Sequence, residues 1–183
     1  MKIRWKIGGK SENLYKRGVK QIECIFVNAF VTSTMKYSTE ILIRLPRKKV
    51  IELFQNPDHL QKWQQGLKSI EPVDGTPGDE GSHSKLVYEG RKGDLVMTET
   101  IIKRELPGSI DMVYRSQGVY NRIENRFTEQ ESDVTMWRSE NYFRFRGIMM
   151  IMAPFLKRAF MHNTLLNMDR FKLFAENEND TAH

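Results

Sequence analysis

The stretch from Gly147 to Glu176 reads GIMMIMAPFLKRAFMHNTLLNMDRFKLFAE and decides the fold class of this chain. Its apolar residues recur at spacings of three and four, which predicts one long helix with a buried face. Pro154 cannot donate a hydrogen bond to the carbonyl of Met150, so we expect a kink or a helix in two pieces. Five of the chain's ten methionines lie in this stretch. Because methionine adapts to irregular space, the helix is expected either to line a cavity or to fill an ordinary core.

Strand-like segments precede this helix, at 37–45, 67–73, 82–88, 94–104, 109–116, 119–129 and 134–146. Most of the later links between them are short and contain glycine, which predicts hairpins and an antiparallel meander. Two short helices, 46–55 and 59–64, are predicted after the first strand. The predicted fold class is therefore α+β, with a curved antiparallel sheet wrapped around a long C-terminal helix.

Alternation along the strands indicates which side chains face the helix. In 119–127 one set is charged and must face water, which places Asn121 and Asn125 inside. In 94–104 one phase puts Met97 and Glu99 inside, and the opposite phase remains open. By the same alternation the last strand points inward through Trp137, Ser139, Asn141 and Phe143.

Glu99 is the sharpest catalytic candidate in the sequence. A carboxyl among apolar residues has a raised pKa and can act as a general acid or base. The alternative is that Glu99 faces solvent or pairs with a cation such as Lys85 or Arg115. The uncharged polar groups at Asn121, Asn125, Ser139 and Asn141 could orient a ligand or satisfy local backbone.

The formal charge of +6 is concentrated at the N-terminus. Residues 1–35 carry 7 Lys/Arg against 2 Asp/Glu, which leaves 22 against 21 in the remainder. A nucleic-acid binder carries its basic footprint on the folded domain, so no nucleic-acid partner is expected. Lys157 and Arg158 lie beside Phe155 and either form a solvated face or contact an anionic membrane transiently.

The domain organisation is predicted from the same patterns. Residues 1–34 form a basic extension that is expected to be poorly ordered or to precede the start that the gene uses, 35–176 form one domain, and 177–183 form a tail. Cys24 is the only cysteine, which excludes an internal disulfide and favours a reducing, cytoplasmic location. No run of apolar residues is long enough to span a membrane.

No cofactor or metal site is predicted. The four histidines show no metal-ligand spacing, and the sequence has no phosphate-binding glycine loop and no nucleophile elbow. His83 lies out of phase with Leu86 and Tyr88, so it is expected to point outward.

One loose motif supports a family resemblance: Pro46-x-x-x-Val50-x-x-Leu53-Phe54-x-x-Pro57 followed by Trp63, between the first strand and the meander. In this order of elements, residues 35–176 resemble the START-like superfamily, and more narrowly the SRPBCC proteins of the polyketide cyclase/dehydrase and lipid transport group. The resemblance implies a helix-grip fold, in which the sheet clasps the last helix and leaves a cavity for an apolar or amphipathic molecule. It does not choose among binders, cyclases and chaperone activators.

Three hypotheses about function follow. The leading one is a cytoplasmic protein that binds a hydrophobic small molecule without covalent chemistry. The second is a cyclase or dehydratase that uses Glu99 in the same cavity, and the third is an interaction protein such as a chaperone activator, with a filled interior. The oligomeric state stays open. The residues predicted to line the cavity are Tyr88, Met97, Glu99, Asn121, Asn125, Trp137, Asn141, Phe143, Met152 and Phe155.

Overall fold

The computed structural model describes residues 33–90 and 93–180. Its helices are α2 (Arg47–Gln55), the short 3-10 turn η1 (Pro57–His59), α3 (Leu60–Trp63) and α4 (Ile148–Asp180). Its strands are β1 (Ser33–Ile43), β2 (Leu67–Asp74), β3 (His83–Tyr88), β4 (Leu95–Glu105), β5 (Ser109–Ser116), β6 (Val119–Glu131) and β7 (Val134–Phe145).

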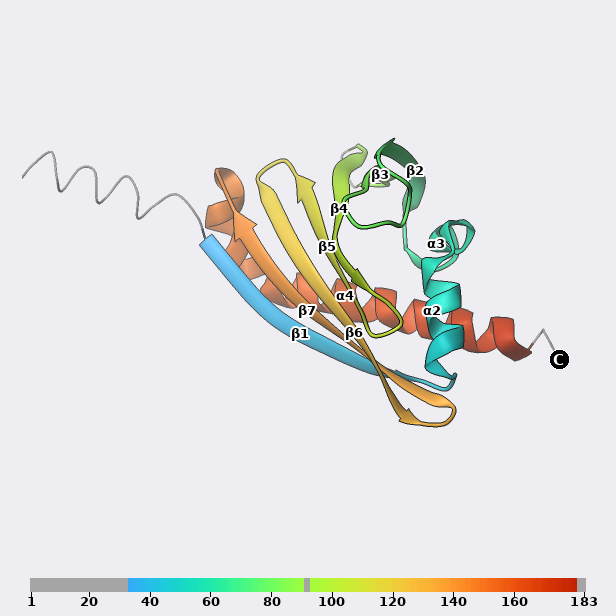
Figure 1. The fold of residues 1–183 in the computed structure, drawn as a ribbon. Helices are drawn as coiled ribbons and strands as arrows, with labels where there is room; N and C mark the ends of the chain where they lie inside the picture. Colours follow the sequence, from blue (N-terminus) through green and yellow to red (C-terminus); the bar gives the residue numbers. More distant parts are fainter. Residues whose placement is uncertain (1–32, 91–92, 181–183) are drawn as a thin grey trace, which may run out of the picture.

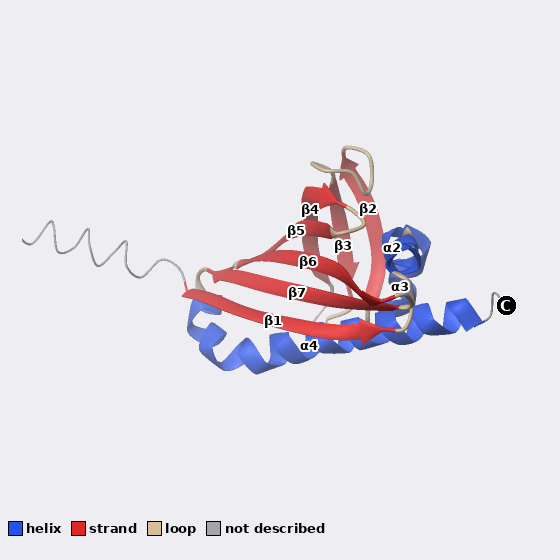
Figure 2. Ribbon diagram, turned by 60° about the horizontal axis from the view of Figure 1, so that its bottom comes forward, coloured by secondary structure: helices blue, strands red, loops and turns tan. Residues whose placement is uncertain are grey.

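The strands form one antiparallel sheet in the order β1-β7-β6-β5-β4-β3-β2. From β1 the chain crosses to the far edge of the sheet through α2 and α3, and then returns strand by strand to β7. Figures 1 and 2 show the sheet curving around α4, which runs along its concave face. This arrangement confirms the predicted helix-grip architecture.

The ends of the domain differ slightly from the prediction. Ser33 and Thr34 pair with Phe145 and Arg144, so β1 starts two residues before the expected boundary at Met35. Helix α4 continues to Asp180 and takes up most of the expected tail. The rest of the predicted extension, residues 1–32, lies outside the described residues. Pro154 lies inside α4, and Figure 2 shows the first turns of this helix at an angle to the rest.

Five aromatic rings from five elements form the centre of the main core. Phe54 of α2 lies 5.2 Å from Phe127 of β6 and 5.3 Å from Trp137 of β7, measured between ring centroids. Phe171 of α4 lies 5.6 Å from Phe54 and 5.2 Å from Trp63 of α3. This aromatic cluster joins both short helices, the sheet and α4 at one end of the domain.

A second apolar cluster holds the beginning of α4 against the sheet. It contains Phe143 and Phe145 of β7 with Ala153 of α4, and Phe160 packs on it with its ring 4.8 Å from Phe143. Helix α4 is therefore packed near both of its ends. In between, the side chains of sheet and helix leave room for a cavity.

Replacement of Phe171 by alanine should test the aromatic cluster. Phe171 is fully buried, so its loss removes contacts with several rings and leaves a cavity, at a cost of about 3 to 5 kcal/mol. Phe155→Ala on the same helix is the matched control, because this ring is exposed and its loss should change stability by about 0.5 kcal/mol at most. Urea unfolding of both variants measures the difference, and equal costs would contradict the assignment of the core.

Candidate functional site

The candidate site is a cavity of about 1440 Å³ between the concave face of the sheet and α4. Residues from both ends border it: Phe54 and Trp137 of the aromatic cluster at one end, Phe143 and Phe160 of the second cluster at the other. Met97, Met112 and Ile123 point inward from β4, β5 and β6 yet are only half-buried, because they face this space. Apolar walls therefore make up much of the cavity.

Glu99 projects into the cavity from β4, and Tyr114 of β5 stands directly opposite it in the sheet. The Tyr114 hydroxyl donates a hydrogen bond to Oε2 of Glu99. Nearby, the hydroxyl of Tyr88 donates to Oε1 of Gln64, just after α3. A carboxyl and two phenols thus line the same part of the wall, contributed by β3, β4 and β5.

Burial raises the pKa of Glu99, and the hydrogen bond from Tyr114 acts in the opposite direction. Burial also raises the pKa of Tyr114 well above its ordinary value, and the nearby charge of Glu99 adds to this effect. Burial and the nearby charge of Glu99 also raise the pKa of Tyr88. Glu99 can therefore stay protonated at pH values above the usual titration range of a carboxyl. Tyr88 and Tyr114 stay protonated as well.

No cation neutralises Glu99 within residues 33–90 and 93–180. Of the two partners considered from the sequence, Lys85 pairs with Glu71 at 3.1 Å, and Arg115 lies over the ring of Tyr120, 5.4 Å from its centroid. The Glu99 side chain therefore points into the cavity, and its hydrogen-bond partner is Tyr114.

A second polar group lies on β6 and β7. The Asn121 amide donates to Oδ1 of Asn141 over 3.3 Å, and the Asn141 amide donates to the Ser139 hydroxyl over 3.1 Å. Oδ1 of Asn121 is buried and has no hydrogen-bond partner among the described residues. Asn125 accepts a bond of 2.9 Å from the indole of Trp137, so its oxygen is already used. These amides satisfy one another or Trp137, and Asn121 keeps an unused acceptor in the cavity wall.

Helix α4 adds further polar groups that the sequence analysis did not identify. The hydroxyls of Tyr37 and Thr164 lie 3.0 Å apart and connect β1 to α4, and Asn163 and Asn167 also line the cavity. Tyr37 alternates in phase with Met35 and Thr39, so strand periodicity could have placed it inside. No sequence signal marks Thr164.

Two predicted lining residues, Met152 and Phe155, lie outside the cavity. Their side chains are 45% and 81% exposed, on the outer side of α4. Met149 and Phe160 line the cavity instead. The first turns of α4 are apolar on both sides, so spacing alone could not choose the inner face. The other predicted lining residues, Tyr88, Met97, Glu99, Asn121, Asn125, Trp137, Asn141 and Phe143, all border the cavity.

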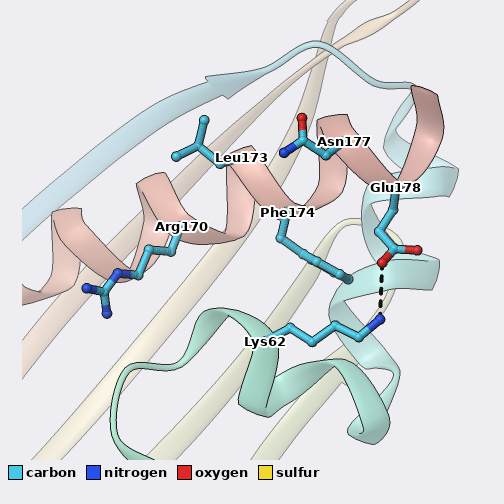
Figure 3. Close-up of a pocket in the computed structure, with 6 residues that line it drawn as sticks. All are labelled: Lys62, Arg170, Leu173, Phe174, Asn177 and Glu178. Carbon is cyan, nitrogen blue, oxygen red and sulfur yellow. Dashed lines mark hydrogen bonds and ion pairs between the residues drawn. The ribbon is translucent and has the colours of Figure 1, made fainter. Parts of the chain in front are cut away.

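A smaller hollow of about 450 Å³ lies between α3 and the C-terminal half of α4 (Figure 3). Figure 3 shows Phe174 and Glu178 pointing from α4 toward α3. Lys62 of α3 pairs with Glu178 at 3.1 Å and lies 5.2 Å from the ring centroid of Phe174. These contacts fasten α3 to α4, and the larger cavity is the better candidate for a ligand site.

In the described part of the chain, no three His, Cys, Asp or Glu side chains come together in a way that could hold a metal ion. None of the described helices combines the length and apolar character needed to cross a membrane.

Comparison with known proteins identifies the fold. No family model and no curated protein sequence matches the chain. Among solved structures, an aromatase/cyclase from Streptomyces sp. R1128 is 12% identical with a TM-score of 0.65, covering 79% of this chain and 94% of its own. A conserved protein from Geobacillus kaustophilus is 15% identical with a TM-score of 0.65, covering 78% and 96%.

Norcoclaurine synthase from Thalictrum flavum, solved in complex with dopamine and hydroxybenzaldehyde, is 12% identical with a TM-score of 0.60 and covers 95% of both chains. The chain thus shares the helix-grip fold of these structures, which the sequence resemblance implies. The TM-scores of 0.60 to 0.65 establish the fold. Sequence identities of 12 to 15% do not establish the activity, which has to be argued from the site.

Replacement of Glu99 by glutamine should change how stability depends on pH. Because the pKa of Glu99 is raised above its ordinary value of 4.5, the folded protein keeps a proton that the unfolded chain releases. The wild-type stability that comes from this proton is complete below the unfolded pKa and is lost as the pH rises through the folded pKa. The free energy of unfolding of Glu99→Gln, relative to wild type, should therefore increase as the pH rises above about 4.5.

Urea unfolding across this pH range makes the measurement. Asp133→Asn, in the exposed turn between β6 and β7, is the control for the loss of a carboxylate. A constant difference between wild type and Glu99→Gln at all pH values would show that burial does not perturb this carboxyl.

Proposed function

We propose that the protein binds a hydrophobic or amphipathic small molecule in the cavity between the sheet and α4. The observation that carries the proposal is the cavity itself, about 1440 Å³ of space in a domain whose two ends are closely packed. Ligand sites typically combine an apolar wall with a few polar groups that fix orientation. Met97, Met112 and Ile123 supply the first, and the Glu99 and Asn121 groups supply the second.

The arrangement of the polar groups favours an amphipathic ligand. Glu99 and Tyr114 lie on β4 and β5, and Asn121 lies on β6 with an unused acceptor. A ligand hydroxyl or amine would find an acceptor on Glu99, with its apolar part against the methionines and α4. The similar fold of norcoclaurine synthase, solved with two small aromatic molecules, supports a small-molecule ligand.

The cavity also bears on the hypothesis of an interaction protein. A filled interior would favour an interaction protein such as a chaperone activator. The interior of this domain instead contains a cavity. We infer that the protein acts in the cytoplasm, because Cys24 is its only cysteine and an internal disulfide cannot form.

Filling the cavity should abolish binding and leave the fold intact. Ile123→Trp places a large ring in the open space in front of β6, so uptake of the neutral probe N-phenyl-1-naphthylamine should fall at least about tenfold while the unfolding midpoint changes little. Tyr142→Trp is the matched control, because this residue of β7 faces solvent on the outer side of the sheet. Loss of stability without loss of probe uptake would contradict an open cavity at this position.

A second candidate function is proton transfer on the bound molecule, as in a cyclase or dehydratase. One observation favours it: Glu99 is a buried carboxyl with a raised pKa, hydrogen-bonded to Tyr114 in the cavity wall. In its ionised form such a carboxylate can accept a proton from a carbon next to a carbonyl, and Tyr114, when it turns its hydroxyl from Glu99 to the substrate, can donate a hydrogen bond to that carbonyl oxygen. Binding alone requires neither step.

Glu99→Gln separates the two functions once native mass spectrometry of protein from its own host has identified a co-purifying molecule. Glutamine keeps the shape, so a binder should retain its affinity within about tenfold, or about 1.4 kcal/mol. An acid/base enzyme would lose about a hundredfold or more in turnover with its affinity almost unchanged. We expect the first result. Product formed by wild type and abolished in Glu99→Gln, but retained in Glu131→Gln at the exposed end of β6, would assign the enzyme instead.

A further inference from the structure

The first turns of α4 expose an unusual number of large apolar side chains. Ile148, Ile151 and Phe155 are 77%, 68% and 81% exposed, and the exposed Met152 lies among them. At 3.6 residues per turn the four fall within an arc of about 100° on the helix. They form one continuous apolar stripe, here called the α4 stripe, on the side of the helix that faces away from the sheet.

The segment of chain that carries the α4 stripe is basic. Residues 141–168 contain Arg144, Arg146, Lys157 and Arg158 and no aspartate or glutamate. All four are exposed, and none has an ion pair with any residue in 33–90 or 93–180. Arg144 lies over the rings of Tyr120 and Tyr142 on the outer face of the sheet, and the other three cations are available to a partner outside the domain.

The α4 stripe lies beside one end of the cavity. Met149, next to Ile148 in the helix, points inward and lines the cavity together with Gln117 and Val119 from the β5–β6 turn. Gly118 of that turn packs closely on the start of α4: a Cβ there would lie 3.4 Å from the Met149 side chain. The same helical turn thus has an inner side on the cavity and an outer side on solvent.

Charge decides what can cover the stripe. A second copy of this chain in a two-fold dimer would place the same cations against one another. The N-terminal segment, with 7 Lys/Arg against 2 Asp/Glu, would be repelled in the same way. An anionic lipid surface supplies both an apolar interior for the stripe and negative head groups for the cations.

We propose that the α4 stripe, with Arg146, Lys157 and Arg158, docks on an anionic membrane surface. The helix lies in the interface with Ile151 and Phe155 immersed below the head groups, and the cations remain at the level of the phosphates. Docking in this orientation brings the Met149 end of the cavity close to the lipid. Binding to the surface does not require a molecule in the cavity, so the two proposals stand or fall separately.

Sedimentation of the full chain with lipid vesicles tests the proposal. We expect binding to vesicles of phosphatidylcholine mixed with phosphatidylglycerol, weakened by high salt, and little binding to phosphatidylcholine alone. The double change Ile151→Ser with Phe155→Ser should reduce the partition coefficient at least about tenfold, and so should Lys157→Glu with Arg158→Glu. Leu173→Ser, exposed near the other end of α4, is the matched control and should bind as wild type does.

A second measurement locates the contact without removing the apolar side chain. The tryptophan of Phe155→Trp should be quenched by brominated lipid in anionic vesicles, and that of Leu173→Trp should not. Absence of vesicle binding, or equal losses in the stripe and Leu173 variants, would overturn the proposal. Conversion of a dimer to a monomer by the serine changes, without vesicle binding, would assign the stripe to contact between copies. Probe uptake by Ile123→Trp is unaffected by any of these results, so failure here leaves the cavity proposal to its own test.

Discussion

The packing of Phe171 among four other rings is the contact on which the rest of the structure depends. It fixes α4 against the sheet at a point where α2 and α3 also meet, so a single buried side chain sets the position of three helices. The second cluster holds the beginning of α4, so the helix is packed against the sheet near both of its ends and crosses the concave face between them. The interior between the supports need not be filled for the domain to be stable. A cavity of this size can therefore exist in a domain with well-packed ends.

The fold could be predicted from the sequence, because each part of it has a local signal. Alternation in β6 and β7 separates charged from apolar faces, and the spacing of apolar residues reveals α4. The partner of Glu99 could not be predicted. Counting back from the β4–β5 turn places Arg115 opposite Glu99, but a bulge between Ile101 and Lys103 shifts the register by one residue and brings Tyr114 there. Such a bulge replaces a cation by a phenol and so changes the chemistry of the site.

Met152 and Phe155 illustrate a different limit. Periodicity identifies a helix from the contrast between its faces, and at the start of α4 the contrast is missing because Met149 and Ala153 on the inner side are as apolar as Ile151 and Phe155 on the outer side. Sequence predicts burial of both faces, and only one face of this helix has a surface to pack on. The residues that escape prediction here are the ones available to a partner, whereas the well-predicted ones belong to the core.

The order of the strands has a consequence for how the chain folds during synthesis. Among the residues that the structure describes, β1 pairs only with β7, and the pair Ser33–Phe145 joins residues separated by most of the domain. On the ribosome β1 emerges before the other described strands and remains without β7 until nearly the whole meander has been made. Closure of this edge is then a late, long-range step that carries a large loop entropy. The alternating polar side chains of β1, such as Lys36, Ser38 and Glu40, keep the waiting strand soluble and protect it from pairing with other nascent chains.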